Sequence, residues 1–149
     1  MTRPANHGAS MESGERYAYF EHDADIGIIG RGATVEEAFE TAAAAMFSIM
    51  TDLADVRAAR TVTIGFEEAD TELALVRWLN SLLAAARENG MVFVAFRLDR
   101  DGAVWRGSAT GESWHDGLER GVEVKGATLT MLSVKRAQAG WEARCIVDV

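Results

Sequence analysis

The stretch Phe20-Glu21-His22-Asp23-Ala24-Asp25-Ile26-Gly27-Ile28 places one histidine and two aspartates within four residues, directly before an apolar run that is interrupted by glycine. The apolar run is typical of a β-strand, whereas aspartate is a poor strand residue. Two aspartates at the start of a strand indicate either a functional site or an Asx-turn, in which each side chain caps its own backbone. The stretch alone leaves both alternatives open.

The bulk composition is that of an ordinary globular chain. It has 149 residues, of which 48% are hydrophobic, and this length suits one domain with a single core. We expect residues 1–15 to be a disordered N-terminal extension, because the segment is polar and lacks apolar anchors, and residues 16–149 to form the domain. The sequence contains no long apolar run, so no membrane-spanning helix is predicted. Residues 1–15 do not resemble a secretory signal.

The charge balance and the cysteine count restrict the functional classes. The net charge is −8, from 23 acidic and 15 basic residues. A nucleic-acid-binding protein usually has a basic face, and no Lys/Arg cluster occurs here, so we expect no strong direct binding to RNA or DNA. The acidic balance fits cation binding or docking onto a basic partner protein. The single cysteine, Cys145, cannot form an internal disulfide, so we expect a cytoplasmic protein.

Helical spacing and end signals predict two helices. Thr34 and Glu37 match a capping box ahead of an alanine-rich segment with one wide apolar face that ends near Met50. Asp70 is a candidate N-cap for the second helix, and Gly90 can end that helix in the left-handed conformation. Asn80 lies off the apolar stripe of this helix, and we expect it to be an ordinary solvated residue.

Apolar runs and turn residues predict the strands. We expect strands at residues 16–20, 26–29, 61–66, 91–98, 103–111, 122–135 and 141–149, with a turn at Gly30-Arg31-Gly32. On the last strand, Cys145 shares its side with apolar residues, so we expect an inert core thiol. The order of elements predicts an α+β single domain, in which one mixed or antiparallel sheet carries two main helices on one face as a two-layer sandwich.

Two carboxylates from opposite ends of the chain form a candidate site for a hard cation. Asp148 is the penultimate residue, so the terminal carboxylate of Val149 lies one residue away. Ca²⁺ and Mg²⁺ prefer oxygen ligands. If the last strand ends beside Asp25, the concentrated negative charge is unfavourable unless a cation or Lys125 neutralises it. The alternative is a frayed, solvated chain end.

A second set consists of His22, Asp23 and Asp25, which are residue types of a transition-metal or acid–base site. Hydrolytic metal sites usually recruit further histidines or aspartates from elsewhere in the chain. The remaining histidines, His7 and His115, lie in the N-terminal arm and in a polar loop. The chain also contains no glycine-rich phosphate loop that ends in Lys-Ser/Thr. A metal-dependent hydrolase therefore remains an alternative without a supporting motif.

Five segments, taken together and in order, resemble the archease family. The first, His22-Asp23-Ala24-Asp25-Ile26-Gly27, is similar to the family's His-Thr-Ala-Asp-Ile-Gly signature, with Asp23 in place of threonine. The other segments are Thr34-Val35-Glu36-Glu37-Ala38-Phe39, Val76-Arg77-Trp78-Leu79-Asn80, Glu123-Val124-Lys125-Gly126-Ala127-Thr128 and Val147-Asp148-Val149. The resemblance extends over residues 17–149.

This resemblance implies a protein cofactor, not a free-standing enzyme. Archeases activate the GTP-dependent RNA ligase that joins a 3′-phosphate or 2′,3′-cyclic phosphate end to a 5′-hydroxyl end in tRNA splicing or RNA repair. They promote guanylylation of the ligase and its multiple turnover. The implied partner is therefore such a ligase, and the alternatives are the metal-dependent hydrolase and a general chaperone-like binding module.

The resemblance also implies site residues. The metal-binding acids of the family match Asp25 and Asp148, with the terminal carboxylate of Val149 nearby, and the implied cofactor is a divalent ion such as Ca²⁺, Mg²⁺ or Mn²⁺. The motif lysine matches Lys125, and His22 and Asp23 are candidate contacts to the ligase. The chain departs from the family where many members carry Tyr-His, at residues 129–130, and contacts through those family histidines are not carried over.

Overall fold

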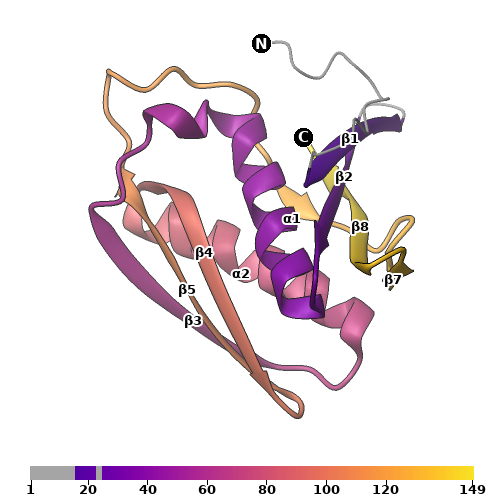
Figure 1. Cartoon of the computed structure of the whole chain (residues 1–149). Coiled ribbons are helices and arrows are strands. Elements are labelled where there is room, and N and C mark those ends of the chain that lie inside the picture. Colours follow the sequence, from indigo (N-terminus) through magenta and orange to yellow (C-terminus); the bar gives the residue numbers. More distant parts are fainter. Residues whose placement is uncertain (1–15, 23–24) are drawn as a thin grey trace.

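The computed structural model describes residues 16–22 and 25–149, in which two antiparallel sheets and two main helices pack together (Figure 1). The first sheet contains β1 (Tyr17–His22), β2 (Asp25–Gly32), β6 (Gly126–Ala127), β7 (Ser133–Ala137) and β8 (Gly140–Asp148). The second contains β3 (Arg60–Glu67), β4 (Met91–Asp101) and β5 (Val104–Ser113). The helices are α1 (Val35–Met50) and α2 (Thr71–Asn89), with a short 3-10 turn, η3 (Leu53–Asp55).

The predicted α+β class with two main helices is confirmed, and the strands are divided between two sheets instead of joined in one. The first sheet has the order β1-β2-β8-β6, with β7 also paired to β8, and the second has the order β3-β5-β4. The chain leaves the first sheet through α1 and returns to it only after β5. The first and last long strands of the chain, β2 and β8, are therefore direct neighbours.

Helix α1 lies between the two sheets, where it contacts β2 and β8 on one side and β4 on the other (Figure 1). Gly30 of β2 permits this close packing, because a Cβ at that position would overlap the α1 backbone at Ala38 and Ala42. The expected turn at residues 30–32 is wrong for the same reason. These residues continue β2, and the absence of a side chain at Gly30 and Gly32 admits the helix backbone.

The helix ends follow the predicted capping residues. The Thr34 hydroxyl accepts a hydrogen bond from the Glu37 amide at 3.0 Å, which starts α1. The Asp70 carboxylate accepts from two amides of the first turn of α2. Gly90 follows α2 with φ 63°, the left-handed conformation that suits glycine. These local signals therefore fix where both helices begin and where α2 ends.

The core confirms the expectation for Cys145. The thiol is fully buried between β2 and α1, and this burial raises the pKa of Cys145 to about 12. Two tryptophans, Trp78 and Trp105, are also fully buried, and the Trp78 indole donates a hydrogen bond to the Phe39 carbonyl at 3.0 Å. Cys145 thus stays a protonated packing residue at neutral pH.

The predicted strand at residues 122–135 is wrong, since only β6 and β7 form in this region. One side of β6 pairs with β8. On its other side, polar side chains of α2 hold the segment where a further strand could pair. Asn80 pairs with the backbone of Ala127, donating to its oxygen at 3.2 Å and accepting from its nitrogen at 2.8 Å. Arg87 donates to the carbonyls of Val124 and Lys125 at 3.2 and 2.8 Å. Asn80 is exposed, as expected for a solvated residue, but its hydrogen bonds to this segment were not expected.

Within the part of the chain that the structure describes, neither helix is long and apolar enough to cross a membrane. The predicted disordered extension, residues 1–15, lies outside the described residues.

The edge strand β4 is covered by a carboxylate, which makes stability depend on pH. Glu40 accepts a hydrogen bond from the Leu98 amide at 2.8 Å, and burial raises the pKa of Glu40 while this hydrogen bond lowers it by less. The folded protein therefore holds this proton more tightly than the unfolded chain. The contribution of Glu40 to the free energy of unfolding must fall as the pH rises through the raised folded pKa.

We predict that Glu40→Gln relieves this loss, because the amide oxygen still accepts from Leu98 but carries no charge. Urea unfolding at several pH values from about 4 to about 7 should show the variant gaining stability relative to the native chain as the pH rises. Glu36→Gln, on the same helix, is the matched control and should show no such gain. A constant difference between the Glu40→Gln and native curves would contradict the prediction.

We predict that Asn80→Ala destabilises the protein by about 1–3 kcal/mol, because it leaves the Ala127 amide and carbonyl without their partner. Chemical denaturation measures the loss, and hydrogen exchange at the Ala127 amide should become faster. Asn89→Ala is the control on the same helix, since the Asn89 side chain bonds only the Ala85 carbonyl within its own helix. Unchanged exchange at Ala127 in the Asn80 variant would show that the side chain does not hold β6.

Candidate functional site

The two aspartates singled out from the sequence lie at the same end of neighbouring strands. Asp25 begins β2 and Asp148 ends β8, and the last pair of their antiparallel register is Ile26 with Val147. The next step of this register places Asp25 opposite Asp148. Directly opposed residues of antiparallel strands have Cβ atoms about 4.5–5.5 Å apart. The fold therefore brings together two carboxylates from opposite ends of the chain.

Both aspartates belong to the face of the first sheet that points away from α1. Side chains alternate between the faces of a strand, and the register pair Ile28 and Cys145, of the opposite parity, is fully buried in the core. Asp25 is half-buried and Asp148 is exposed. Both carboxylates are consequently accessible to an ion or to a partner.

The C-terminal residue supplies a third carboxylate at this position. Val149 is partly buried and packs against the hydrophobic core, so the chain end is anchored and the alternative of a frayed terminus does not describe it. We call Asp25, Asp148 and the terminal carboxylate of Val149 the acidic edge. Like charges that face each other across neighbouring strands repel, so the acidic edge concentrates negative charge at one end of the sheet.

Lys125 contributes to this edge through its backbone. Its amide donates to the Asp148 carbonyl at 2.7 Å, and the following residue, Gly126, is the register partner of Asp148. The Lys125 side chain is exposed and forms no ion pair within residues 16–22 and 25–149. Its backbone fixes the position of Asp148, and its ammonium group is available to a partner.

The other predicted residues are only partly described. His22 is the last residue of β1, and its register partner is Asp25, which places the first motif residue beside the acidic edge. Nothing is described of the His22 side chain, and Asp23 lies outside the described residues. The proposal of a hydrolytic set made by His22, Asp23 and Asp25 therefore stays a prediction.

Among the described side chains, no group of three His, Cys, Asp or Glu residues is arranged to hold a metal ion. The acidic edge has two such side chains and needs the terminal carboxylate as its third group. His115 lies elsewhere, where its Nε2 contacts the Glu112 carboxylate at 3.2 Å and its Nδ1 accepts from the Gly117 amide. The Arg57 amide, a hydrogen-bond donor to Glu112, keeps the pKa of that carboxyl below its usual range.

The sequence did not reveal the residues of α2 that support the segment next to this edge. Asn80 and Arg87 both reach from α2 to the segment that contains Lys125. They are seven positions apart, which places them two turns apart on one face of the helix. This spacing is visible in the sequence, but it indicates a polar pair only when the segment facing it is known.

Comparison with known proteins identifies the family. The model of the Archease protein family (MTH1598/TM1083) matches residues 17–149. The protein archease of Sulfolobus acidocaldarius is 34% identical over 137 residues, which cover 90% of this chain and 99% of that protein. The protein archease of Methanosarcina mazei is 32% identical over 142 residues, which cover 91% of this chain and 97% of that protein.

Solved structures are similar as well. The solution structure of Methanobacterium thermoautotrophicum protein 1598 has a TM-score of 0.76 and 31% identity, and the match covers 90% of this chain and 99% of that one. The crystal structure of the Thermotoga maritima protein TM1083, described as an archease and possible chaperone, has a TM-score of 0.60 and 19% identity, with 87% and 94% covered. The second likeness concerns the fold alone. The family model and the relatives together cover nearly all of the folded residues, and the chain belongs to the archease family.

Proposed function

We propose that this chain is a non-catalytic activator of a GTP-dependent RNA ligase and that its acidic edge binds a divalent cation required for activation. The observation that carries the proposal is the register of β2 and β8, which places Asp25 opposite Asp148 beside the anchored Val149. Family membership supports the activator role, and the acidic edge supplies a physical reason for it.

The donor set of the acidic edge fits a hard cation. All three groups are carboxylates, which suit Ca²⁺, Mg²⁺ or Mn²⁺ better than imidazole- or thiolate-seeking metals. Ca²⁺ takes about 6–8 oxygen ligands, so three carboxylates leave positions for water or for the oxygens of a partner. When bound, the ion would supply positive charge toward phosphate oxygens. The chain's own residues would hold and orient it at an accessible edge.

In this proposal the acidic edge is presented to the nucleotide site of the ligase. Lys125 keeps Asp148 in place through its amide and would offer its exposed ammonium group to the ligase surface. His22 and Asp23 belong to the same end of the sheet by sequence and register and would contact the ligase there. The activated steps would be guanylylation and repeated turnover of the ligase, in tRNA splicing or RNA repair in the cytoplasm.

Two other functions make different demands. A metal-dependent hydrolase built on His22, Asp23 and Asp25 should cleave phosphoesters without a partner. A general chaperone-like module should bind many unfolded proteins and should not need the acidic edge. An assay of the purified chain on a phosphoester, beside a guanylylation assay with the ligase of the source cell, separates all three. The proposal requires inactivity in the first assay and stimulation in the second.

We predict that Asp25→Asn and Asp148→Asn each abolish stimulation of ligase guanylylation and weaken divalent-cation binding about tenfold or more. Both substitutions keep the side-chain shape and remove one charge, so the circular dichroism spectrum should not change. Asp101→Asn, an exposed site on the second sheet, is the matched control. Full stimulation by both acidic-edge variants would refute the mechanism.

We also predict that one glycine added after Val149 gives a milder defect of the same kind. The addition moves the terminal carboxylate about 3.3–3.6 Å along the chain and leaves both aspartates in place. Cation affinity, measured by calorimetry, should fall less than in Asp148→Asn. Unchanged affinity and unchanged stimulation would exclude the terminal carboxylate from the site.

A further inference from the structure

A pocket of about 450 Å³ lies between the C-terminal ends of α1 and α2 and the irregular segment that links β5 to β6. Its size falls within the range of about 300–1,000 Å³ that is usual for ligand-binding pockets. Its inner wall is apolar and includes the buried side chains of Phe47, Leu83 and Met91. None of these residues belongs to the acidic edge, so the pocket is a second candidate site.

The linking segment is held in place by both helices, so the pocket is formed in the free protein. The amides of Gly121 and Val122 donate to the carbonyls of Met50 and Ile49 at 2.7 and 3.1 Å, at the end of α1. The Trp114 amide donates to the C-cap residue of α2 at 3.0 Å. Such a long segment without regular structure, fixed at several points, is usually functional.

The rim of the pocket combines apolar surface with positive charge. Val122 is 48% exposed although it is a large aliphatic residue. The Arg120 guanidinium lies 3.8 Å from the centre of the Trp114 ring, and it has no hydrogen bond or ion pair to any residue within 16–22 and 25–149. Arg87 also lines the pocket, and so does one acid, Glu123, which forms no ion pair with either arginine in that part of the chain.

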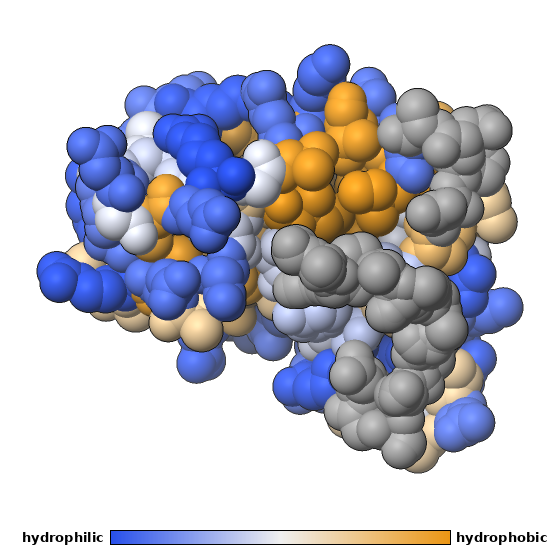
Figure 2. Space-filling view, turned by 90° about the horizontal axis from the view of Figure 1, so that it is seen from above, coloured by the Kyte–Doolittle hydropathy of each residue, from blue (hydrophilic) through white to orange (hydrophobic). Residues whose placement is uncertain are grey.

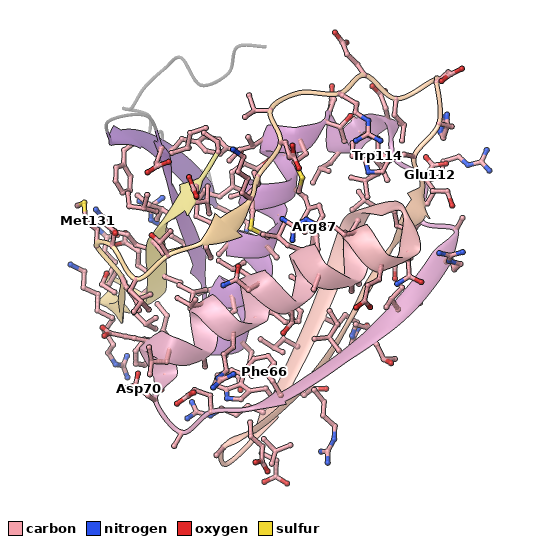
Figure 3. All side chains as sticks on the ribbon, turned by 180° about the vertical axis from the view of Figure 1, so that it is seen from behind. Phe66, Asp70, Arg87, Glu112, Trp114 and Met131 are labelled. Carbon is pink, nitrogen blue, oxygen red and sulfur yellow. The ribbon has the colours of Figure 1, made fainter. Side chains whose placement is uncertain are left out.

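The figures show the surroundings of two of these residues and the surface of one end of the molecule. Figure 2 looks down on the end where the chain terminates and shows an apolar patch bordered by polar surface. Figure 3 shows Trp114 on the linking segment and Arg87 on α2, reaching toward the same segment. Exposed Val122 and partly buried Met50 both line the pocket.

The pocket adjoins the acidic edge. Val124 lines the pocket, and the next residue, Lys125, donates its amide to the Asp148 carbonyl. A partner protein that covers the acidic edge and extends along this segment would also reach the pocket. The two surfaces differ in charge, since the edge carries three carboxylates and the pocket carries two arginines and one glutamate.

We infer that the pocket is a docking site for the partner ligase and takes a segment in which a large apolar side chain stands next to a carboxylate. The inference rests on the proposed function. The apolar wall and Val122 would bury the apolar side chain, and the guanidinium of Arg120, held over the Trp114 ring, would pair with the carboxylate. The part of the partner that faces the acidic edge must then be basic or carry a metal ion. The part that faces the pocket must carry both an acidic and an apolar side chain.

The test uses Val122→Arg and Arg120→Glu in the full chain. Both side chains are exposed, so both variants should fold, which circular dichroism checks. Each should raise the Kd for the ligase about tenfold or more, as expected for a residue central to an interface. Leu73→Arg is the matched control, because Leu73 is a 39% exposed apolar residue at the opposite end of α2, and its Kd should stay native. Divalent-cation affinity should stay native in all three.

The outcomes are distinguishable from failure of the proposed function. If the native chain neither binds nor stimulates the ligase, the proposed function fails, and this inference fails with it. If the native chain stimulates the ligase and both pocket variants bind it with native Kd, only the docking inference is overturned. It is also overturned if native mass spectrometry finds a small molecule, or sedimentation finds a second copy, that Val122→Arg releases while ligase binding is kept.

Discussion

The antiparallel pairing of β2 with β8 is the constraint on which the candidate site depends. A shift of one residue in a strand register moves every side chain to the other face of the sheet. Here such a shift would remove Ile28 or Cys145 from the core against α1, where both are fully buried. The same register places Asp25 opposite Asp148 at the open end of the strands. The geometry of the acidic edge is thus fixed by apolar packing several residues away.

The energies of the two effects explain why the fold keeps this arrangement. If two carboxylates on opposed residues lie about as far apart as their Cβ atoms, about 5 Å, they repel by about 1 kcal/mol in bulk water and by about 3 kcal/mol at an effective dielectric constant of ~20. Asp148 is exposed and Asp25 is half-buried, which favours the lower figure. Burial of one large aliphatic side chain stabilises a fold by about 1.5–3 kcal/mol, and Ile28, Ile146 and Val147 are all buried on these strands. The core therefore outweighs the repulsion, and a cation is not needed to hold the strands together.

The sequence predicted the elements that depend on local signals and failed where tertiary contacts decide. Thr34, Asp70 and Gly90 mark helix ends because their side chains or backbone freedom act within one turn. The pairing of Asp25 with Asp148 was a conditional hypothesis from residue types, and the family resemblance supported it, since no local pattern reports which strands are neighbours. Residues 30–32 look like a turn because glycine is rare in strands, but the close approach of α1 demands small residues there.

The segment between β5 and β7 is a second place where local sequence signals did not predict the structure, and this segment connects the two candidate sites. Its alternating apolar residues resemble a strand, yet most of its hydrogen bonds go to helices and to side chains. On the side of β6 that faces away from β8, the Asn80 side chain makes the two hydrogen bonds to Ala127 that a neighbouring strand would make. Arg87 binds the carbonyls of Val124 and Lys125. Since Lys125 in turn binds the Asp148 carbonyl, the segment that forms one wall of the pocket also supports the acidic edge. The two surfaces share one backbone element, and α2 sets the position of that element for both of them.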